Sequence, residues 1–188
     1  MIQDIQVRPT RNAGTVDWSP GPLGLGQLLD STHNTFTAGP QKVVVKVDGD
    51  AAKLQQNTPG GLRVNFGPGD FVLETSKATD RLILTFDPPV SAAAIQMAAI
   101  SNPFPGHFTG VAEAFLDDGT EPPEIRTSGT TTGVRDGKAI CVGFECSPGD
   151  PLIALIALSI ETSERNIIAL AVNQLTFVSA AEIGRAHV

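Results

Sequence analysis

Apolar and polar residues alternate along much of the chain, in short runs separated by Gly, Pro, Asp and Ser. Residues 81–86, RLILTF, show the alternation most clearly, with Leu82, Leu84 and Phe86 on one face of an extended strand. A period of two is typical of a strand that buries one face against a core. The pattern therefore predicts β-structure, and we expect the face that carries Phe86 to lie inside.

The same pattern gives about ten short strands, with breaks spaced about 8–12 residues apart. The predicted strands are residues 42–47, 61–66, 71–76, 81–86, 92–100, 110–116, 124–131, 139–144, 152–160 and 166–178. Strands this short, with no long helices between them, favour an all-β fold, an antiparallel β-sandwich of jelly-roll-like form. In this prediction residues 1–39 are an irregular N-terminal segment and residues 40–179 are the sandwich domain.

Two segments need a local argument. Residues 87–90, DPPV, are expected to end the preceding strand, because proline cannot donate to a central hydrogen-bond ladder. Residues 152–160, LIALIALSI, are harder to assign, since Leu152, Leu155 and Ile156 would also line one face of a helix. The run is short and lies between two β-like segments, so a fully buried strand is predicted.

The last predicted strand changes parity in its middle. Leu170 and Val172 share one face of a regular strand, whereas Leu175 and Phe177 share the other, so one pair would face solvent. A β-bulge at Asn173–Gln174 would bring both pairs into the core and re-aim the side chain of its first residue. We expect the re-aimed amide to bond to neighbouring backbone, as buried amides usually do.

Size and charge narrow the classes of function. A chain of 188 residues is long enough to bury a core without a metal or a disulfide. The net charge is −7 and no basic run is present, which argues against a nucleic-acid partner, because phosphate binding needs a positive face. No apolar run approaches the ~20 residues of a transmembrane helix, so no membrane insertion is expected in this fragment. No signal peptide pattern is seen at residues 1–10.

Residues 182–188, EIGRAHV, continue no pattern set before them. A common short-read sequencing adapter encodes this peptide when it is read through in one frame. We interpret the segment as a translated adapter, an artefact that fold reasoning should leave aside, with a short native tail as the alternative. In that interpretation the true C-terminus is unknown and His187 is discounted as a site residue.

Four aspartates are candidate calcium ligands, because Ca²⁺ prefers several carboxylate and carbonyl oxygens. Asp117 and Asp118 begin the acidic stretch DDGTEPPE, where Asp-Gly is also ordinary turn chemistry. Asp70 in GPGD and Asp150 in SPGD occupy matching contexts, and two such loops at one end of a sandwich could share a cation. Each aspartate can instead accept amides of its own turn. No cofactor other than calcium is predicted.

The sequence predicts no catalytic residue. It contains no G-x-S-x-G, H-E-x-x-H or paired C-x-x-C motif, and His33 and His107 have no companion at metal or triad spacing. Two carboxylates would serve a glycosidase only if held about 5–10 Å apart across a cleft. We therefore expect a protein that is not an enzyme, with a hydrolase on the same fold as the third alternative.

Cys141 and Cys146 are the only cysteines. Along one straight strand their Cα atoms would lie about 16 Å apart, well beyond the ~7 Å that a disulfide allows. A bond therefore requires a turn within residues 143–146, GFEC, and an exported protein would favour one. A disulfide and an ordinary core role for Cys141 both stay open.

Five stretches between residues 18 and 178 carry a resemblance to a known group. They read VNFGPGDFVLETS, LILTFDPPVSAAAIQMAA, FTGVAEAFLDDGT, AICVGFEC and LAVNQLTF. They resemble motifs of largely uncharacterised bacterial exported proteins, some of which carry a C-terminal sorting tag of the PEP-CTERM type. The resemblance implies a β-sandwich and export, extracellular or in the cell envelope, and it supplies no catalytic residue. This chain departs from the group at FECSPGD, where the group often has Ser-Asp.

The prediction for function is a non-enzymatic exported module with a structural or surface-recognition role in the bacterial envelope or matrix. Its expected partner is a glycan or another envelope or matrix component. The alternative is a calcium-stabilised carbohydrate-binding module. One Trp and no Tyr argue against an aromatic platform for sugars, which leaves a polar site built from loops.

Overall fold

The computed structural model describes residues 3–4, 13–19, 23–58, 65–120, 124–132 and 139–180. Its strands are β1 (Gln3–Asp4), β2 (Gly14–Val16), β3 (Thr35–Ala38), β4 (Gln41–Asp48), β5 (Ala52–Gln56), β6 (Phe71–Thr75), β7 (Arg81–Ser101), β8 (Gly106–Leu116), β9 (Glu124–Thr131), β10 (Ile140–Glu145), β11 (Ile153–Glu161) and β12 (Ile167–Ser179). Most of the predicted strand 61–66 and the whole of residues 182–188 fall outside the described residues.

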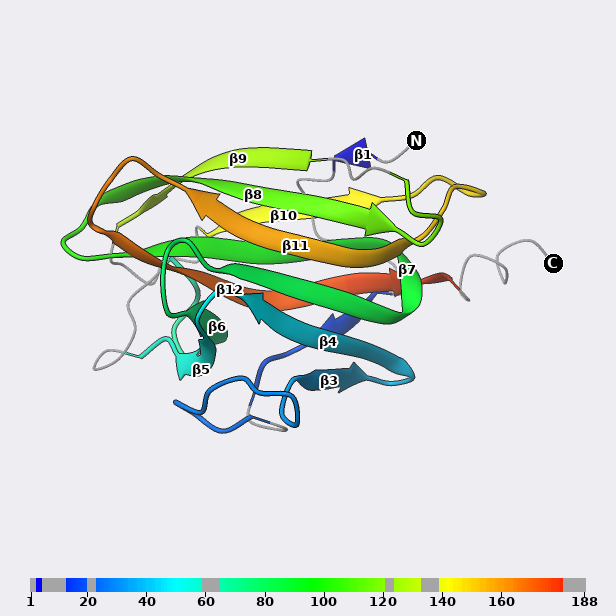
Figure 1. The fold of residues 1–188 in the computed structure, drawn as a ribbon, viewed down its shortest axis with the longest axis horizontal. Coiled ribbons are helices and arrows are strands. Elements are labelled where there is room, and N and C mark those ends of the chain that lie inside the picture. The colour runs from blue at the N-terminus through cyan, green and yellow to red at the C-terminus, as the bar shows by residue number, and fades with distance from the viewer. Residues whose placement is uncertain are drawn as a thin grey trace.

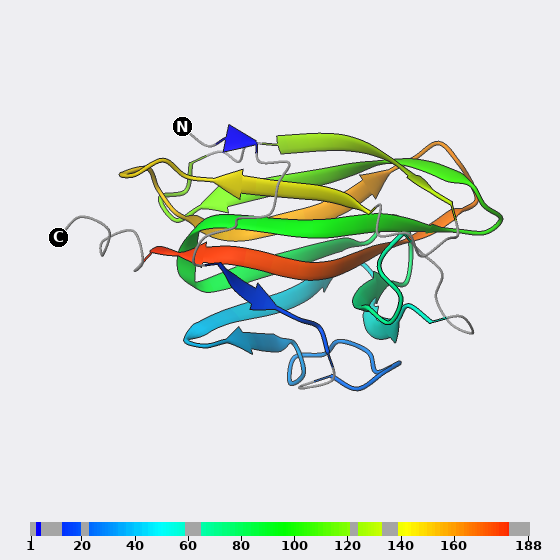
Figure 2. The same cartoon turned by 180° about the vertical axis from the view of Figure 1, so that it is seen from behind.

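The strands form an antiparallel β-sandwich, which confirms the predicted fold class. The front sheet of Figure 1 has the order β3-β4-β7-β11-β8-β9. The back sheet, which faces the viewer in Figure 2, contains β5, β6, β12, β7, β10 and β1, with β2 beside the second half of β12. Strand β7 belongs to both sheets, so all twelve strands share one continuous hydrogen-bonded network.

Strand β7 passes from one sheet to the other at its prolines. Residues up to Asp87 pair with β4, whereas residues from Val90 onward pair with β12. The prediction that residues 87–90 end the strand is therefore wrong. Pro88 and Pro89 have no Cα partner in either ladder, so their missing N–H groups cost no sheet hydrogen bond.

The core lies between the two sheets and follows the predicted parity. Leu82, Leu84 and Phe86 are buried, while the residues between them are half-buried, which confirms the face assignment for residues 81–86. The segment LIALIALSI forms β11, between β7 and β8, so its assignment as a strand is also confirmed. Its burial on both faces explains why its sequence lacks a clean alternation.

The predicted bulge is present in β12. Val172 pairs with Met97 and Leu175 pairs with Ile95, so three steps along β12 match two along β7. All four apolar side chains of the parity argument, Leu170, Val172, Leu175 and Phe177, are buried. The extra residue at Asn173–Gln174 thus does what the hydrophobic pattern required.

The N-terminal segment differs from the irregular chain that was predicted. It contributes β2, which pairs with β12, and β3, which pairs with β4. Trp18 is fully buried and meets Phe36 edge to face, with ring centroids 4.9 Å apart. Short strands rich in Gly and Thr carry little periodicity, and their apolar anchors pack on surfaces supplied by distant strands.

The structure also decides the question of the cysteines. No disulfide joins Cys141 to Cys146, because β10 stays extended through the turn that a bond would need. Cys146 is buried beyond the end of β10, and burial raises the pKa of its thiol. Cys146 is therefore part of the hydrophobic core, whereas Cys141 is half-buried on β10.

Candidate functional site

A groove of about 640 Å³ lies where β8 and β9 approach the loop after β11. We call it the β9 groove. Nine of its twelve lining residues have polar side chains, and six of these are hydroxyl side chains. The residues that line it are Asn65, His107, Phe108, Thr109, Ser128, Gly129, Thr130, Thr132, Ile140, Glu161, Thr162 and Ser163.

The local sequence explains how the groove acquires an apolar floor and a polar rim. In the β8–β9 ladder Phe108 pairs with Gly129, and a Cβ at Gly129 would lie only 2.5 Å from the phenyl ring. The absence of a side chain at Gly129 lets the ring pack flat against β9, as aromatic residues opposite glycine do. Their neighbours His107 and Thr130 point the other way, and both are exposed.

His107 is fixed in the groove by contacts with three residues, one on β9 and two in the loop after β11. Its Nδ1 lies 3.0 Å from Thr130 Oγ1, its backbone N–H donates to Glu164 Oε2 at 3.0 Å, and its carbonyl accepts from Thr162 Oγ1 at 2.9 Å. Thr162 Oγ1 in turn accepts from the Glu164 amide. The loop after β11 is therefore tied to β8, and the imidazole is held at the rim.

Asn65 closes the opposite wall. Its Nδ2 donates to the carbonyl of Thr130 at 2.8 Å, and its Oδ1 accepts from the amide of Thr132 at 3.2 Å. The side chain is buried, so the amide is a built part of the wall rather than a mobile surface group. Sequence reasoning missed Asn65, because nothing local in VNF indicates a contact with a strand 65 residues away.

The charged residues of the groove are already paired. Arg126 donates to both carboxylate oxygens of Glu161, at 2.9 and 2.5 Å, and also to Glu124 at 2.8 Å. Glu161 lines the groove, whereas its partner stands on the outer face of β9. The bidentate pair fixes the Glu161 carboxylate in one orientation.

Two residues singled out in the sequence, Asp70 and Asn173, meet in a second pocket. The re-aimed Asn173 donates through Nδ2 to Asp70 Oδ2 at 2.7 Å, and the same oxygen accepts from the Gly67 amide at 2.8 Å. The bulge thus directs the amide to a carboxylate. The prediction that the amide bonds to neighbouring backbone is therefore wrong. Asp17 and Gln174 also line this pocket of about 340 Å³, which we call the bulge pocket.

The other candidate calcium ligands lie in turns. Asp117 Oδ1 accepts from the Leu152 amide at 3.0 Å, and Asp118 Oδ1 accepts from the amide and hydroxyl of Thr120. The Asp118 bonds are the turn chemistry given as the alternative, whereas the Asp117 bond joins its turn to a residue 35 positions away, and the Thr120 hydroxyl lowers the pKa of Asp118. Asp150 donates its backbone N–H to the carbonyl of Ser147 in its own turn, at 3.0 Å. Across the described ranges, no three His, Cys, Asp or Glu side chains are grouped for a metal.

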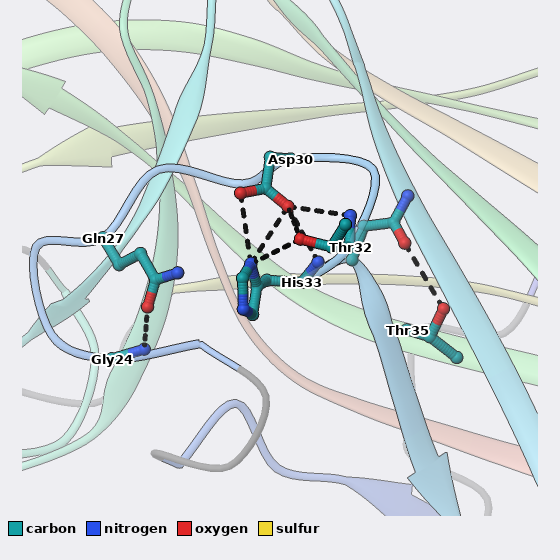
Figure 3. Close-up of polar contacts among 7 residues, drawn as sticks. Gly24, Gln27, Asp30, Thr32, His33 and Thr35 are labelled. Carbon is teal, nitrogen blue, oxygen red and sulfur yellow. Dashed lines mark hydrogen bonds and ion pairs between the residues drawn. The ribbon is translucent and has the colours of Figure 1, made fainter.

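His33, for which no companion was found in the sequence, has two in the structure (Figure 3). Its Nδ1 lies 3.0 Å from Asp30 Oδ1 and 2.8 Å from Thr32 Oγ1. The hydroxyl of Thr32 and the ring of His33 hold the pKa of the Asp30 carboxyl well below its usual range. Thr32 and Asp30 both contact Nδ1, so the cluster lacks the relay order of a catalytic triad and caps a turn.

The sequence matches no protein-family model, and no curated protein sequence is similar to it. Among solved structures, the chain is similar to a DUF4465 family protein from Bacteroides caccae, at 13% identity over 94% of this chain and 99% of that one, with a TM-score of 0.46. It is also similar to the CBM22-2 xylan-binding domain of Paenibacillus barcinonensis Xyn10C, at 16% identity over 88% and 98%, with a TM-score of 0.43.

A third similar structure is the family 11 carbohydrate-binding module from Clostridium thermocellum in complex with a β-1,3-1,4-mixed-linked tetrasaccharide. It shares 10% identity over 89% of this chain and 96% of that one, with a TM-score of 0.34. Likenesses this weak are to domains of similar size and do not bear on what this chain binds.

Proposed function

We propose that this protein is a non-catalytic recognition module that binds a neutral glycan in the β9 groove. The observation that carries the proposal is the wall of hydroxyl and amide groups, held in place by the contacts of His107 and Asn65. Sugar hydroxyls both donate and accept hydrogen bonds, so a rigid wall of such groups complements them with little loss of entropy on binding. The exposed rim and the apolar floor suit one extended glycan chain.

The charges favour a neutral ligand. Among the described residues, Glu161 lines the groove and Glu164 holds the backbone of His107, while the cation Arg126 is already paired with Glu161. The whole chain carries a net charge of −7, so an anionic polysaccharide meets repulsion at long range as well. We infer that uronic-acid polymers bind more weakly than neutral ones.

The same contacts support the non-catalytic part of the proposal. A glycosidase needs one carboxyl group that can donate a proton and a second one across the cleft. Both side-chain oxygens of Glu161 are already engaged by hydrogen bonds from Arg126, which opposes a role in proton transfer to a substrate. A binding role in the extracellular space or cell envelope fits a polar groove of this kind, and in the described residues no helix has the length and apolarity to span a membrane.

The test is a calorimetric titration with soluble xylan, mixed-linked β-1,3-1,4-glucan and polygalacturonate. We expect at least one neutral polymer to bind with a dissociation constant of about 1 mM or lower, and polygalacturonate to bind more weakly. Thr130→Val, which removes the hydroxyl that contacts His107 without a change in size, should weaken binding. No heat from either neutral polymer would refute the proposal.

Calcium stabilisation is a second candidate, favoured by the bulge pocket. Asp17, Asp70, Asn173 and Gln174 offer carboxylate and amide oxygens from three segments, the donor type that Ca²⁺ prefers. These residues would hold the ion. A thermal scan in CaCl₂ against EDTA should then show a higher melting temperature in calcium, because a ligand of the native state stabilises it by mass action. Equal melting temperatures, or the same shift in Asp70→Asn, would remove this candidate.

A further inference from the structure

Strand β9 has a single hydrogen-bonded neighbour, β8, among the described strands, and its other edge borders the β9 groove. Three consecutive residues, Ser128, Gly129 and Thr130, line the groove, although neighbours along a strand point to opposite faces. The groove therefore meets both faces of β9, and the contacts of Asn65 with Thr130 and Thr132 place it beside the edge that has no partner among the described strands. Edge strands expose a row of N–H and C=O groups there.

The contacts of Asn65 identify which main-chain groups point into the groove. Asn65 binds the carbonyl of Thr130 and the amide of Thr132, so both residues direct their main chain away from β8. The N–H and C=O of one strand residue point the same way, and the direction alternates along the strand. Ser128, two residues earlier, therefore also presents its N–H and C=O to the groove.

We propose that the main-chain N–H and C=O of Ser128 bind the glycan directly, and that Asn65 marks the end of this binding edge. The inference rests on the proposed function, since its ligand is the neutral glycan of the β9 groove. An N–H beside a C=O offers one donor and one acceptor, and further along the same edge the Asn65 amide already binds one acceptor and one donor, the carbonyl of Thr130 and the N–H of Thr132. A hydroxyl group of a sugar can occupy the Ser128 pair in the same way.

Main-chain recognition predicts a contrast between two substitutions at one position. Ser128→Ala removes the hydroxyl and keeps the N–H, whereas Ser128→Pro removes the N–H that points away from β8, a place where an edge strand tolerates proline. In titrations with the neutral polysaccharide that binds the wild type more tightly, Ser128→Ala loses one groove hydroxyl and should bind a few-fold more weakly than wild type, and Ser128→Pro should bind at least about tenfold more weakly than Ser128→Ala. Glu124→Pro is the matched control, because Glu124 has the same parity on β9 and lies outside the groove.

Amide hydrogen exchange on the wild-type protein gives a second measurement that does not depend on the folding of a proline variant. Saturating polysaccharide should slow exchange at Ser128 and leave Glu124 unchanged. Wild-type affinity in folded Ser128→Pro, or unaltered exchange at Ser128 in the saturated complex, would overturn the main-chain proposal while leaving glycan binding intact. Failure of the wild type to bind either neutral polymer would instead overturn the proposed function, and the main-chain proposal with it.

Discussion

Two pockets of the described residues, the bulge pocket and the β9 groove, use their polar groups in opposite ways. In the bulge pocket, Asn173 and the Gly67 amide are both bound to one oxygen of Asp70, so protein groups satisfy one another. In the β9 groove, Asn65 and the loop after β11 fix the walls through the backbone and leave a row of hydroxyl groups facing outward. The first pocket joins segments of the core, and the second lines a strand edge.

The difference lies in what each pocket contributes to the free energy of unfolding. Asn173 is 7% exposed and directly follows core residues of β12, so a change there disturbs packing as well as hydrogen bonding. His107 is exposed at the rim, so its loss leaves the core intact. We expect substitutions in the bulge pocket to reduce stability, and substitutions on the groove rim to reduce binding.

Deletion of Gln174 should have the largest effect. Without the extra residue, β12 must expose either Leu170 with Val172 or Leu175 with Phe177, at a cost of roughly 3–5 kcal/mol of lost burial. Urea unfolding of the deletion variant measures this loss. Gln174→Ala keeps the residue count and is the control, expected to cost less than about 1 kcal/mol. Equal losses in the two variants would mean that the bulge is not what places both pairs in the core.

Asn173→Ala should come next, because it leaves the Asp70 carboxylate without its 2.7 Å hydrogen bond. Loss of a buried bond to a charged group costs about 1–3 kcal/mol. A double-mutant cycle with Asp70→Ala, followed by chemical denaturation, isolates the pair. The double variant should lose less stability than the two single variants added together. Strict additivity would show that the two side chains do not stabilise each other.

These effects separate what the sequence could reveal from what it could not. The faces of β7 and the bulge of β12 follow from period-two parity, which local sequence carries. The predicted bulge also indicates that the side chain of Asn173 is re-aimed. Its partner Asp70 is 103 residues away, however, and no local pattern encodes such a contact. At Pro88 the sequence predicts a strand end where β7 instead passes from one sheet to the other. The rule for proline concerns a single hydrogen-bond ladder and does not cover a strand that two sheets share.

The β9 groove was not predicted for the same reason. Its hydroxyl residues belong to β8, β9 and the loop after β11, and each looks like an ordinary strand or loop residue in sequence. Ser128 and Thr130 could be placed on the solvent face of a strand, but the edge position of β9 depends on the order of all strands in the sheet. Strand order is a property of long-range pairing, which alternation along one strand does not specify.

Substitution of Glu74 should raise the stability of the protein slightly, whereas the two changes at Asn173 and Gln174 lower it. Glu74 pairs with Ala171, two positions before Asn173. Burial raises the pKa of Glu74, an effect opposed by Lys53, whose Nζ lies 3.7 Å from its carboxylate. The folded state then binds the proton more tightly than the unfolded state, so the stability of the protein falls as pH rises through the raised pKa. Glu74→Gln should add less than about 1 kcal/mol at neutral pH and nothing at pH values below about 4. Denaturation at both pH values measures the difference, and a loss of stability at neutral pH would mean that the Lys53 pair outweighs burial.

His107→Ala should change stability least, by less than about 0.5 kcal/mol, because the side chain is exposed and its Nδ1 has one contact, with Thr130. Its affinity for the neutral polysaccharide should nevertheless fall several-fold, since the imidazole stands on the rim and orders the Thr130 hydroxyl. His33→Ala is the matched control, because His33 also belongs to a polar cluster but lies outside the groove. Thermal unfolding and titration of both variants test the distinction between the pockets directly. If His107→Ala lowers the melting temperature by several degrees, the rim is part of the folding core; if both histidine variants bind as wild type does, the ligand does not use this rim.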